Sequence, residues 1–352
     1  MKMKKNPLFW LPAVIGTLLS VALIVIGLSS FSSSKSYQKC TENPKITETK
    51  KAIDLAYKTR KKSDITKAQT YVNALNKENQ KIYSDKVSKI EQDVEELNKI
   101  NKFLNKLKNN ITEQNLKEAK KAIDTLKDPY FNNEKNKFLN ILNNFEKKYK
   151  NQFKGKKLIA LTFDDGPNPT TTPQLLDILE SKKVPVTFFA LGENAQQYPE
   201  IIAQEAKNGH EVASHTWDHK DLQTLSREEQ KKEILNANQL INKITGQDVS
   251  LYRPPYGSYN EDILKLTSLT IVNWSVDTND WRYNTSEPVI ENALNYVYDG
   301  SIILLHDIHP WSVEAVPQII DTLHQQGYTF VTVSTLIETH YGKIKPQTAY
   351  FE

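Results

Sequence analysis

The sequence predicts an α/β protein in which a distorted (β/α)7 barrel is preceded by a transmembrane helix and an all-α stalk. After residue 155, seven β-like runs alternate with helix-length segments, and such alternation is typical of a parallel sheet. Ionisable side chains follow the ends of several of these runs, at the edge where barrels of this class build their sites. An uncharged stretch at 8–28 and a glycine-free segment at 44–150 predict the two preceding parts.

The barrel elements are predicted from apolar runs and helical periodicity. Strands are expected at 158–163, 184–191, 210–214, 249–253, 271–276, 301–305 and 328–333. Helices are expected at 173–182, 195–208, 227–245, 287–298 and 313–326. Ser226 and Glu229 form a capping-box pattern at the start of the third helix. Seven units indicate a barrel with one unit missing, over residues 155–342, with a short tail at 343–352.

The N-terminal residues predict a membrane anchor. Residues 8–28 carry no charge and, as a helix, would span roughly 30 Å, the thickness of the hydrocarbon core of a bilayer. Three lysines lie within residues 1–7, so the positive-inside rule keeps this end cytoplasmic and exports the rest of the chain. A cleaved signal peptide is the alternative, although its apolar core should be only about 7 to 15 residues long. The polar residues 29–43 are expected to form a linker.

Residues 44–154 predict a helical stalk with an internal repeat. Apolar residues recur there at helical spacing, and the pattern returns about 51 residues later. The matched pairs are Ile53 with Leu104, Ala56 with Leu107, Ala68 with Ala119, Val72 with Ile123, and Leu75 with Leu126. Two tandem helical units are the natural interpretation. The alternative is one irregular coiled coil or partial disorder, because asparagine is frequent and the apolar stripes are thin.

Residues able to bind a metal or move protons lie just after predicted strands. Asp164 and Asp165 occur in TFDDGP, and His215 and His219 occur in HTWDH. The two histidines are four residues apart, which lets both imidazoles face one ion. Two imidazoles and one carboxylate leave coordination positions open, as in catalytic rather than structural sites. Each signal alone is weak, but their shared position at one edge of the barrel predicts a metal-dependent hydrolase.

Five motifs carry a resemblance to a known family. TFDDGP, SHTWDH, RPPYG, DTNDW and LLHD resemble, in this order, the motifs of the NodB-homology polysaccharide deacetylases (carbohydrate esterase family 4). The resemblance covers about residues 155–340. The anchor, the helical segment and the HDIHP sequence are most similar to the membrane-anchored peptidoglycan N-acetylglucosamine deacetylases of Gram-positive bacteria. It implies deacetylation of N-acetylglucosamine in peptidoglycan strands; the alternatives are another N-acetylated glycan, such as chitin oligomers or poly-N-acetylglucosamine, and a non-catalytic glycan-binding scaffold.

The resemblance implies a base and a metal site. Asp164 would be the general base, braced by Arg253. Asp165, His215 and His219 would bind a divalent metal. This ligand set suits Zn²⁺ best and also accepts Co²⁺, Ni²⁺ or Mn²⁺.

The resemblance also implies an acid and a substrate pocket. His306 would be the general acid, oriented by Asp280, whose negative charge raises the pKa of the imidazole. The backbone N–H of Tyr256 would help to form the oxyanion hole. Trp281 and Leu304 would line the acetyl pocket.

Charge separates the stalk from the barrel. Residues 1–154 contain 31 Lys and Arg against 16 Asp and Glu, a net charge of +15, whereas residues 155–352 contain 15 against 26, a net charge of −11. A basic stalk beside a membrane suits anionic partners such as lipid headgroups or phosphate-rich wall polymers; an ordinary solvated helical surface is the alternative. Aromatic residues do not interleave with the lysines as nucleic-acid stacking requires, so no nucleic-acid partner is expected.

Overall fold

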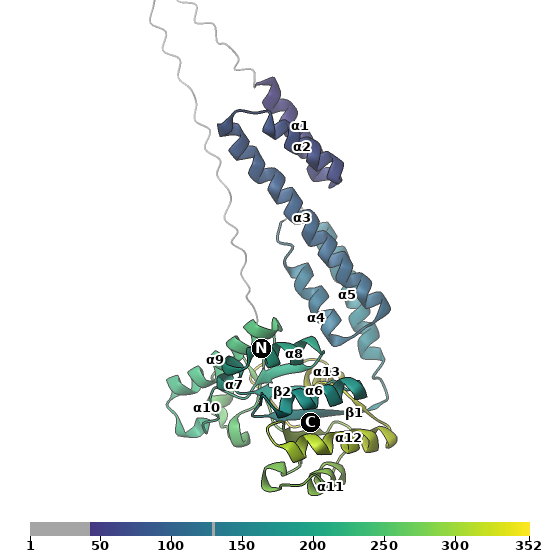
Figure 1. The fold of residues 1–352 in the computed structure, drawn as a ribbon, viewed down its shortest axis with the longest axis vertical. Coiled ribbons are helices and arrows are strands. Elements are labelled where there is room, and N and C mark those ends of the chain that lie inside the picture. Colours follow the sequence, from purple (N-terminus) through teal and green to yellow (C-terminus); the bar gives the residue numbers. More distant parts are fainter. Residues whose placement is uncertain (1–42, 129–130) are drawn as a thin grey trace, which may run out of the picture.

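The computed structural model describes residues 43–128 and 131–352, and shows an elongated helical region joined to an α/β domain (Figure 1). The predicted cytoplasmic end, the predicted anchor and nearly all of the predicted linker therefore lie outside the described residues. Within the described ranges, no helix combines the length and the apolar character needed to cross a bilayer. The anchor remains a prediction.

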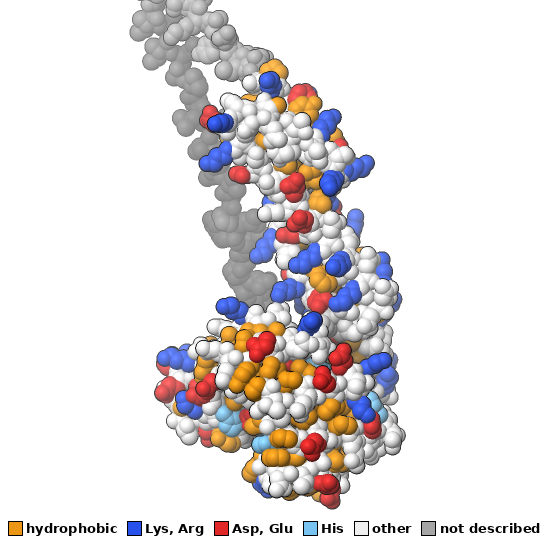
Figure 2. All heavy atoms as spheres, viewed as in Figure 1, with side chains coloured by type: hydrophobic (Ala, Val, Ile, Leu, Met, Phe, Trp, Pro, Cys, Tyr) orange, Lys and Arg blue, Asp and Glu red, His pale blue; other side chains and the backbone are white. Residues whose placement is uncertain are grey.

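The helical region consists of long helices joined by short turns. Its described helices are α1 (Pro44–Thr59), α2 (Lys62–Asn73), α3 (Lys77–Asn109), α4 (Glu113–Asp124) and α5 (Asn132–Asn151). Side-chain caps fix several starts, because Asn76 accepts a hydrogen bond from the backbone N–H of Asn79 and Thr112 accepts one from Asn115. Lys and Arg side chains lie along the whole visible length of this region (Figure 2).

The long helix α3 takes part in two separate apolar clusters. Its first half packs with α1 and α2 around Val72 and Val87, and its second half packs with α4 and α5 around Leu107 and Ile123. Both members of each pair matched in the sequence repeat are buried. The region is thus two three-helix units that share α3.

The α/β domain is built on a parallel sheet, which confirms the predicted fold class in its coarser form. The strands of the described chain are β1 (Lys157–Asp164), β2 (Thr187–Ala190), β3 (Glu211–Ser214), β4 (Leu251–Tyr252), β5 (Thr270–Val272), β6 (Val276–Asp277), β7 (Ile302–His306), β8 (Tyr328–Phe330) and β9 (Ala349–Tyr350). Their order is β6-β7-β1-β2-β3-β4-β5-β9, with β8 beside the start of β1. Asp164 pairs with both Phe189 and His306, so the carboxyl ends of β1, β2 and β7 meet at one edge.

Helices pack against both faces of this sheet. They are α6 (Thr171–Lys182), α7 (Gly192–Gln197), α8 (Pro199–Lys207), α9 (Arg227–Thr245), α10 (Glu261–Leu264), α11 (Glu287–Asn295), α12 (Pro310–Gln325) and α13 (Val333–Tyr341). Alternate residues of β1 point to opposite faces. Ile159 and Leu161 join the cluster with α6, α8, α9, α11 and α12, whereas Leu158 and Ala160 join the cluster with α13. The predicted capping box of Ser226 and Glu229 is present at the start of α9.

The sheet departs from the predicted barrel in two places. One is β9, which pairs with β5 and lies within residues 343–352. The single strand expected at 271–276 is two strands, because β5 pairs with β4 and β9 whereas β6 pairs with β7 at the opposite edge of the sheet. Val272 and Val276 are four residues apart, which limits the distance between their Cα atoms to about 14 Å. The sheet therefore curls until its edges are near one another, but β6 and β9 are its unpaired ends among the described strands. The helix expected at 195–208 is likewise divided, because Pro199 begins a new helix.

Candidate active site

The turn after β1 places two carboxylates at the catalytic edge. Asp164 is the last residue of the strand, and Asp165 follows with a φ of 73°, in the left-handed region. Two hydrogen bonds hold this backbone, from the Asn194 side chain to the carbonyl oxygen of Asp165 (2.8 Å) and from the Leu191 N–H to that of Gly166 (3.0 Å). A Cβ at Gly166 would lie 2.3 Å from Asp307 Oδ2, so only glycine fits there. Both carboxylates reach the same imidazole, because Asp164 Oδ2 is 3.8 Å and Asp165 Oδ1 is 3.4 Å from His215 Nε2.

Asp165, His215 and His219 converge on one point, as the sequence predicts. Their candidate ligand atoms all lie within 4.8 Å of one another. Asp165 Oδ1 is 3.4 Å from His215 Nε2 and 3.5 Å from His219 Nε2. Burial raises the pKa of Asp165, but the surrounding imidazoles outweigh burial and hold that pKa well below its ordinary value. The carboxylate is therefore anionic, as a metal ligand must be.

The donor set fits a tetrahedral divalent cation. Ligand bonds of about 2.0 to 2.2 Å at tetrahedral angles place ligand atoms roughly 3.4 Å apart, close to the separations from Asp165 Oδ1. That oxygen is buried and makes no hydrogen bond to the described residues, a cost that a metal bond would remove. The carbonyl oxygen of Arg253 lies 2.8 Å from His215 Nδ1, which leaves Nε2 free to coordinate. The residues present thus fit the metal that the sequence predicts.

Arg253 holds Asp164 in place. Its guanidinium is fully buried and donates to Asp164 Oδ1 (2.7 Å) and to Thr162 Oγ1 (2.9 Å). It also donates to the carbonyl oxygens of Val272 and Asn273 and stacks over the Phe189 ring at 4.0 Å. A buried cation with this many partners is fixed in position. Arg253 therefore binds Asp164 Oδ1 and leaves Asp164 Oδ2 available for a different partner.

His306 and Asp280 form a second acid–base pair at the end of β7. Asp280 is fully buried and accepts from His306 Nδ1 and from the backbone N–H of His306, both at 2.7 Å. Burial lowers the pKa of His306, but the hydrogen bond and charge of Asp280 outweigh burial and raise it to about 9. His306 Nε2 faces the metal cluster, 3.9 Å from Asp165 Oδ2. A protonated imidazole thus lies beside the predicted ligands.

The predicted pocket residues lie around these groups. Tyr256 has a φ of 60°, and its ring lies 4.8 Å from that of His219, so its side chain is next to the metal cluster. Leu304 is buried in β7. Trp281 is 53% exposed and has the Arg282 guanidinium 4.4 Å above its ring. The oxyanion and acetyl-pocket roles of these residues stay predictions.

Several residues support Asp280 and its surroundings through contacts that were not predicted from the sequence. Ser312 donates to Asp280 Oδ2 (2.5 Å), and Trp311 Nε1 donates to the Asp280 carbonyl oxygen (2.7 Å). The His309 ring stacks on Trp311 with the centroids 4.7 Å apart. Asp307 is fully buried and hydrogen-bonded to the Thr172 hydroxyl. These partners come from different elements, so only the stretch HDIHPWS after β7 offers a local signal.

Comparisons with known proteins agree with this geometry. A polysaccharide deacetylase family model matches residues 151–272. The peptidoglycan-N-acetylmuramic acid deacetylase PdaC of Bacillus subtilis is 43% identical over 52% of this chain and 39% of its own length. The peptidoglycan-N-acetylglucosamine deacetylase PgdA of Listeria monocytogenes is 40% identical over 56% of this chain and 42% of its own length. The chain thus spans about two fifths of these relatives.

Other relatives are matched over most of their length. A peptidoglycan-N-acetylglucosamine deacetylase of Bacillus cereus is 37% identical over 54% of this chain and 74% of its own length. The solved structure of peptidoglycan deacetylase PdaC is similar with a TM-score of 0.52 and 42% identity, over 53% of this chain and 93% of that structure. The chain therefore belongs to the polysaccharide deacetylase family, the NodB-homology carbohydrate esterases of family 4.

Proposed function

We propose that the protein is a metal-dependent deacetylase that hydrolyses the N-acetyl group of N-acetylglucosamine residues in peptidoglycan and releases acetate. The observation that carries this proposal is the convergence on Asp165, whose carboxylate oxygens lie 3.4 to 3.9 Å from the imidazoles of His215, His219 and His306. A metal site, a fixed carboxylate and a protonated acid are what amide hydrolysis requires at neutral pH.

The base acts first in the proposed reaction. A divalent cation held by Asp165, His215 and His219, most suitably Zn²⁺, would polarise the amide carbonyl and lower the pKa of the attacking water. Asp164, oriented by Arg253, accepts the proton of that water as its oxygen bonds to the carbonyl carbon. The backbone N–H of Tyr256 is proposed to donate to the oxyanion.

The acid completes the reaction. An amine is a poor leaving group unless it is protonated, so the C–N bond breaks as His306 gives its proton to the amide nitrogen. Asp280 keeps His306 protonated until that step, because it raises the pKa of the imidazole to about 9. The products are acetate and a glycan amine. Trp281 and Leu304 are proposed to surround the methyl group.

Substrate identity is proposed from the relatives. The names of the relatives include deacetylases of N-acetylglucosamine and of N-acetylmuramic acid in peptidoglycan and of chitooligosaccharides. We also propose that residues 8–28 anchor the protein in the cell membrane with the catalytic domain facing the cell wall, and that the basic helical region contacts anionic wall polymers or lipids. The uncharged segment and the +15 charge of residues 1–154 support this.

The proposal is tested by acetate release. Purified peptidoglycan, chitin oligomers and poly-N-acetylglucosamine are compared with and without a chelator, and mass spectrometry of the digested glycan locates the free amines. The expected result is chelator-sensitive release from peptidoglycan with free amines on N-acetylglucosamine. The Asp164→Asn variant should retain metal and lose most turnover. Metal-loaded protein that releases no acetate from any of the three glycans would instead support the glycan-binding scaffold.

A further inference from the structure

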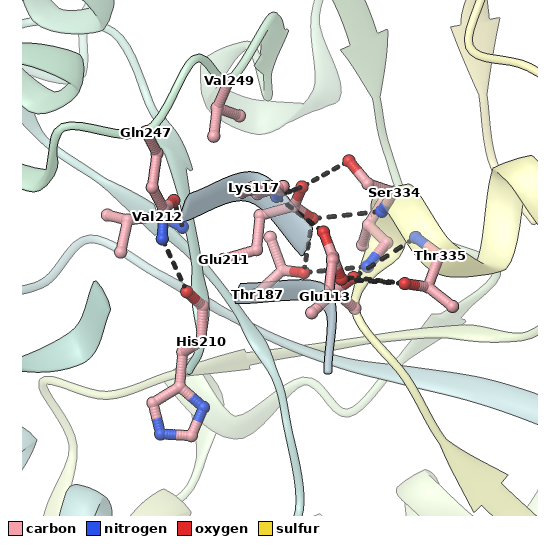
Figure 3. Close-up of polar contacts among 12 residues, drawn as sticks. Glu113, Lys117, Thr187, His210, Glu211, Val212, Gln247, Val249, Ser334 and Thr335 are labelled. Carbon is pink, nitrogen blue, oxygen red and sulfur yellow. Dashed lines mark hydrogen bonds and ion pairs between the residues drawn. The ribbon is translucent and has the colours of Figure 1, made fainter. Parts of the chain in front are cut away.

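The helical region contacts the α/β domain through a charged cluster rather than through apolar surfaces alone. Figure 3 shows Glu113 and Lys117 of α4 beside Glu211, Ser334 and Thr335 of the α/β domain. Glu113 Oε1 is 2.6 Å from Lys117 Nζ, and Lys117 Nζ is 3.9 Å from Glu211 Oε1. We call Glu113, Lys117 and Glu211 the junction cluster. It joins residues almost one hundred positions apart in the sequence.

Glu211 is the most deeply buried member of the junction cluster. Its side chain is 1% exposed, and it accepts hydrogen bonds from Thr187 Oγ1 (3.0 Å) and from the Ser334 backbone N–H (3.1 Å) and hydroxyl. Lys117 is the cation beside it among the described residues. Burial raises the pKa of Glu211, and Lys117 opposes that rise. The Lys117 side chain is itself 35% exposed, so its removal would leave the buried charge of Glu211 uncompensated, which is unfavourable.

Glu113 links the same cluster to α13. Its carboxylate accepts from Thr332 Oγ1 (2.5 Å) and from Thr335 Oγ1 (2.8 Å) at the start of that helix. Burial raises the pKa of Glu113, but Lys117 and the two hydroxyls outweigh burial and hold the pKa below its ordinary value. Lys117 therefore balances two carboxylates, one from each part of the protein.

Contacts around the junction cluster extend the attachment. Phe153, next to the last turn of α5, is buried in the cluster that Leu158 and Ala160 form with α13, where Tyr149 also packs. Lys150 pairs with Glu338 at 3.0 Å, and Lys121 donates to the Gly246 carbonyl oxygen at 3.0 Å. A cleft of about 900 Å³ lies between α4, α5 and the domain. Apolar side chains thus pack closely over only part of the junction, and ion pairs and hydrogen bonds join the two parts of the protein around the cleft.

The junction lies at the amino-terminal ends of the strands, whereas the active site lies at their carboxyl ends. Glu211 and Thr187 are the first residues of β3 and β2, whereas His215 directly follows the other end of β3. Four residues of strand separate Glu211 from His215 by about 13 Å. The helical region extends from the amino-terminal ends as a rod, in which α3 alone has 33 residues and is about 50 Å long. The active site therefore faces away from the rod.

We propose that α4 and α5 are permanently docked on the catalytic domain and that Lys117 is the positioning residue of this docking. The helical region is then a rigid arm that holds the active site at a fixed orientation and reach from the N-terminal residues, rather than a flexible tether. This inference concerns the arrangement of the two parts and stands independently of the proposed substrate.

The test measures the distance distribution across the junction. Spin labels are attached to cysteines at Ser88, on α3, and at Lys232, on α9, in the full chain with Cys40→Ser, since Cys40 is the one native cysteine. The long arm amplifies a small rotation at the junction. Wild-type protein should give one narrow distribution by double electron–electron resonance. Lys117→Met should widen it roughly twofold or more, because domains without a strong interface move relative to one another, while Lys120→Met, an exposed lysine on the same helix, should not.

Rescue distinguishes the charge from a general loss of stability. Adding Glu113→Gln and Glu211→Gln to Lys117→Met removes both carboxylate charges that Lys117 balanced and should restore most of the narrow distribution. A wide wild-type distribution, or a Lys117→Met distribution as narrow as that of wild type, overturns the proposal. Should Lys117→Met fail to fold, Lys117→Gln replaces it, because glutamine can still hydrogen-bond to Glu113 but carries no charge. A wild-type width in Lys117→Gln would then decide against the proposal.

Discussion

The Asp280–His306 pair offers a quantitative test of the proposed acid. Asp280 contacts both the imidazole and the backbone N–H of His306 at 2.7 Å. Although burial lowers the pKa of His306, Asp280, with smaller contributions from the charges of Asp164 and Asp165, raises it to about 9, compared with an ordinary value of about 6.5. That difference corresponds to roughly 3 kcal/mol in favour of the protonated imidazole.

Asp280→Asn should move the alkaline limb of the pH–rate profile to lower pH. The amide of the variant can still accept a hydrogen bond, but it carries no charge, so the pKa of His306 should fall towards about 6.5 or below. Because the acid must be protonated to act, the limb should move down by about 2 pH units. The measurement is kcat/KM for acetate release from soluble N-acetylglucosamine oligomers between pH 5 and pH 10, at constant metal occupancy.

Ser312→Ala is the matched control. It removes the hydrogen bond at 2.5 Å to the other oxygen of Asp280 but leaves the negative charge, so the alkaline limb should move by less than about 0.5 pH unit. Coinciding alkaline limbs for Asp280→Asn and wild type would refute the role of Asp280 in tuning His306.

Three further predictions concern the metal, the acid and the turn. His215→Ala should lose bound metal and activity together while the domain stays folded; elemental analysis and circular dichroism check this, and full metal occupancy with full activity would contradict it. His306→Ala should retain far more activity on an activated aryl acetate than on N-acetylglucosamine oligomers, since the aryl oxide leaves without a proton, and equal losses would argue against the acid. Gly166→Ala should cost about 1–3 kcal/mol in denaturant unfolding and clearly less in an Asp307→Ala background, since the added Cβ meets that carboxylate.

Local patterns predict most of the fold because its elements obey simple periodicities. The helix expected at 227–245 and the strands expected near β1, β3 and β7 occur with ends within a residue or two of the prediction. The strand expected at 271–276 was wrong as one unit because Asn273 to Ser275 cross between the two edges of the sheet. A short apolar run carries no information about which neighbours its two halves will pair with.

The site could be predicted where chemistry is concentrated in a motif, and not where it depends on distant partners. Asp165, His215 and His219 lie together as the sequence predicts. Ser312 and Thr172, in contrast, are ordinary helix residues until α12 and α6 place them against Asp280 and Asp307. A serine or threonine in the first turn of a helix has many common uses, so nothing local distinguishes these two.

Charge in the helical region has a similar ambiguity. Glu113 and Lys117 are four residues apart, the spacing of an ordinary exposed ion pair. They belong to the basic segment for which a solvated helical surface was one of the two interpretations. In the structure this pair instead reaches the base of β3 and contacts a carboxylate that is 1% exposed. The boundary predicted at residue 155 stays a prediction, but Phe153 just before it is buried in the catalytic domain. Since α4 and the metal ligands lie at opposite ends of the strands, the junction can set the orientation of the active site without contacting the catalytic residues.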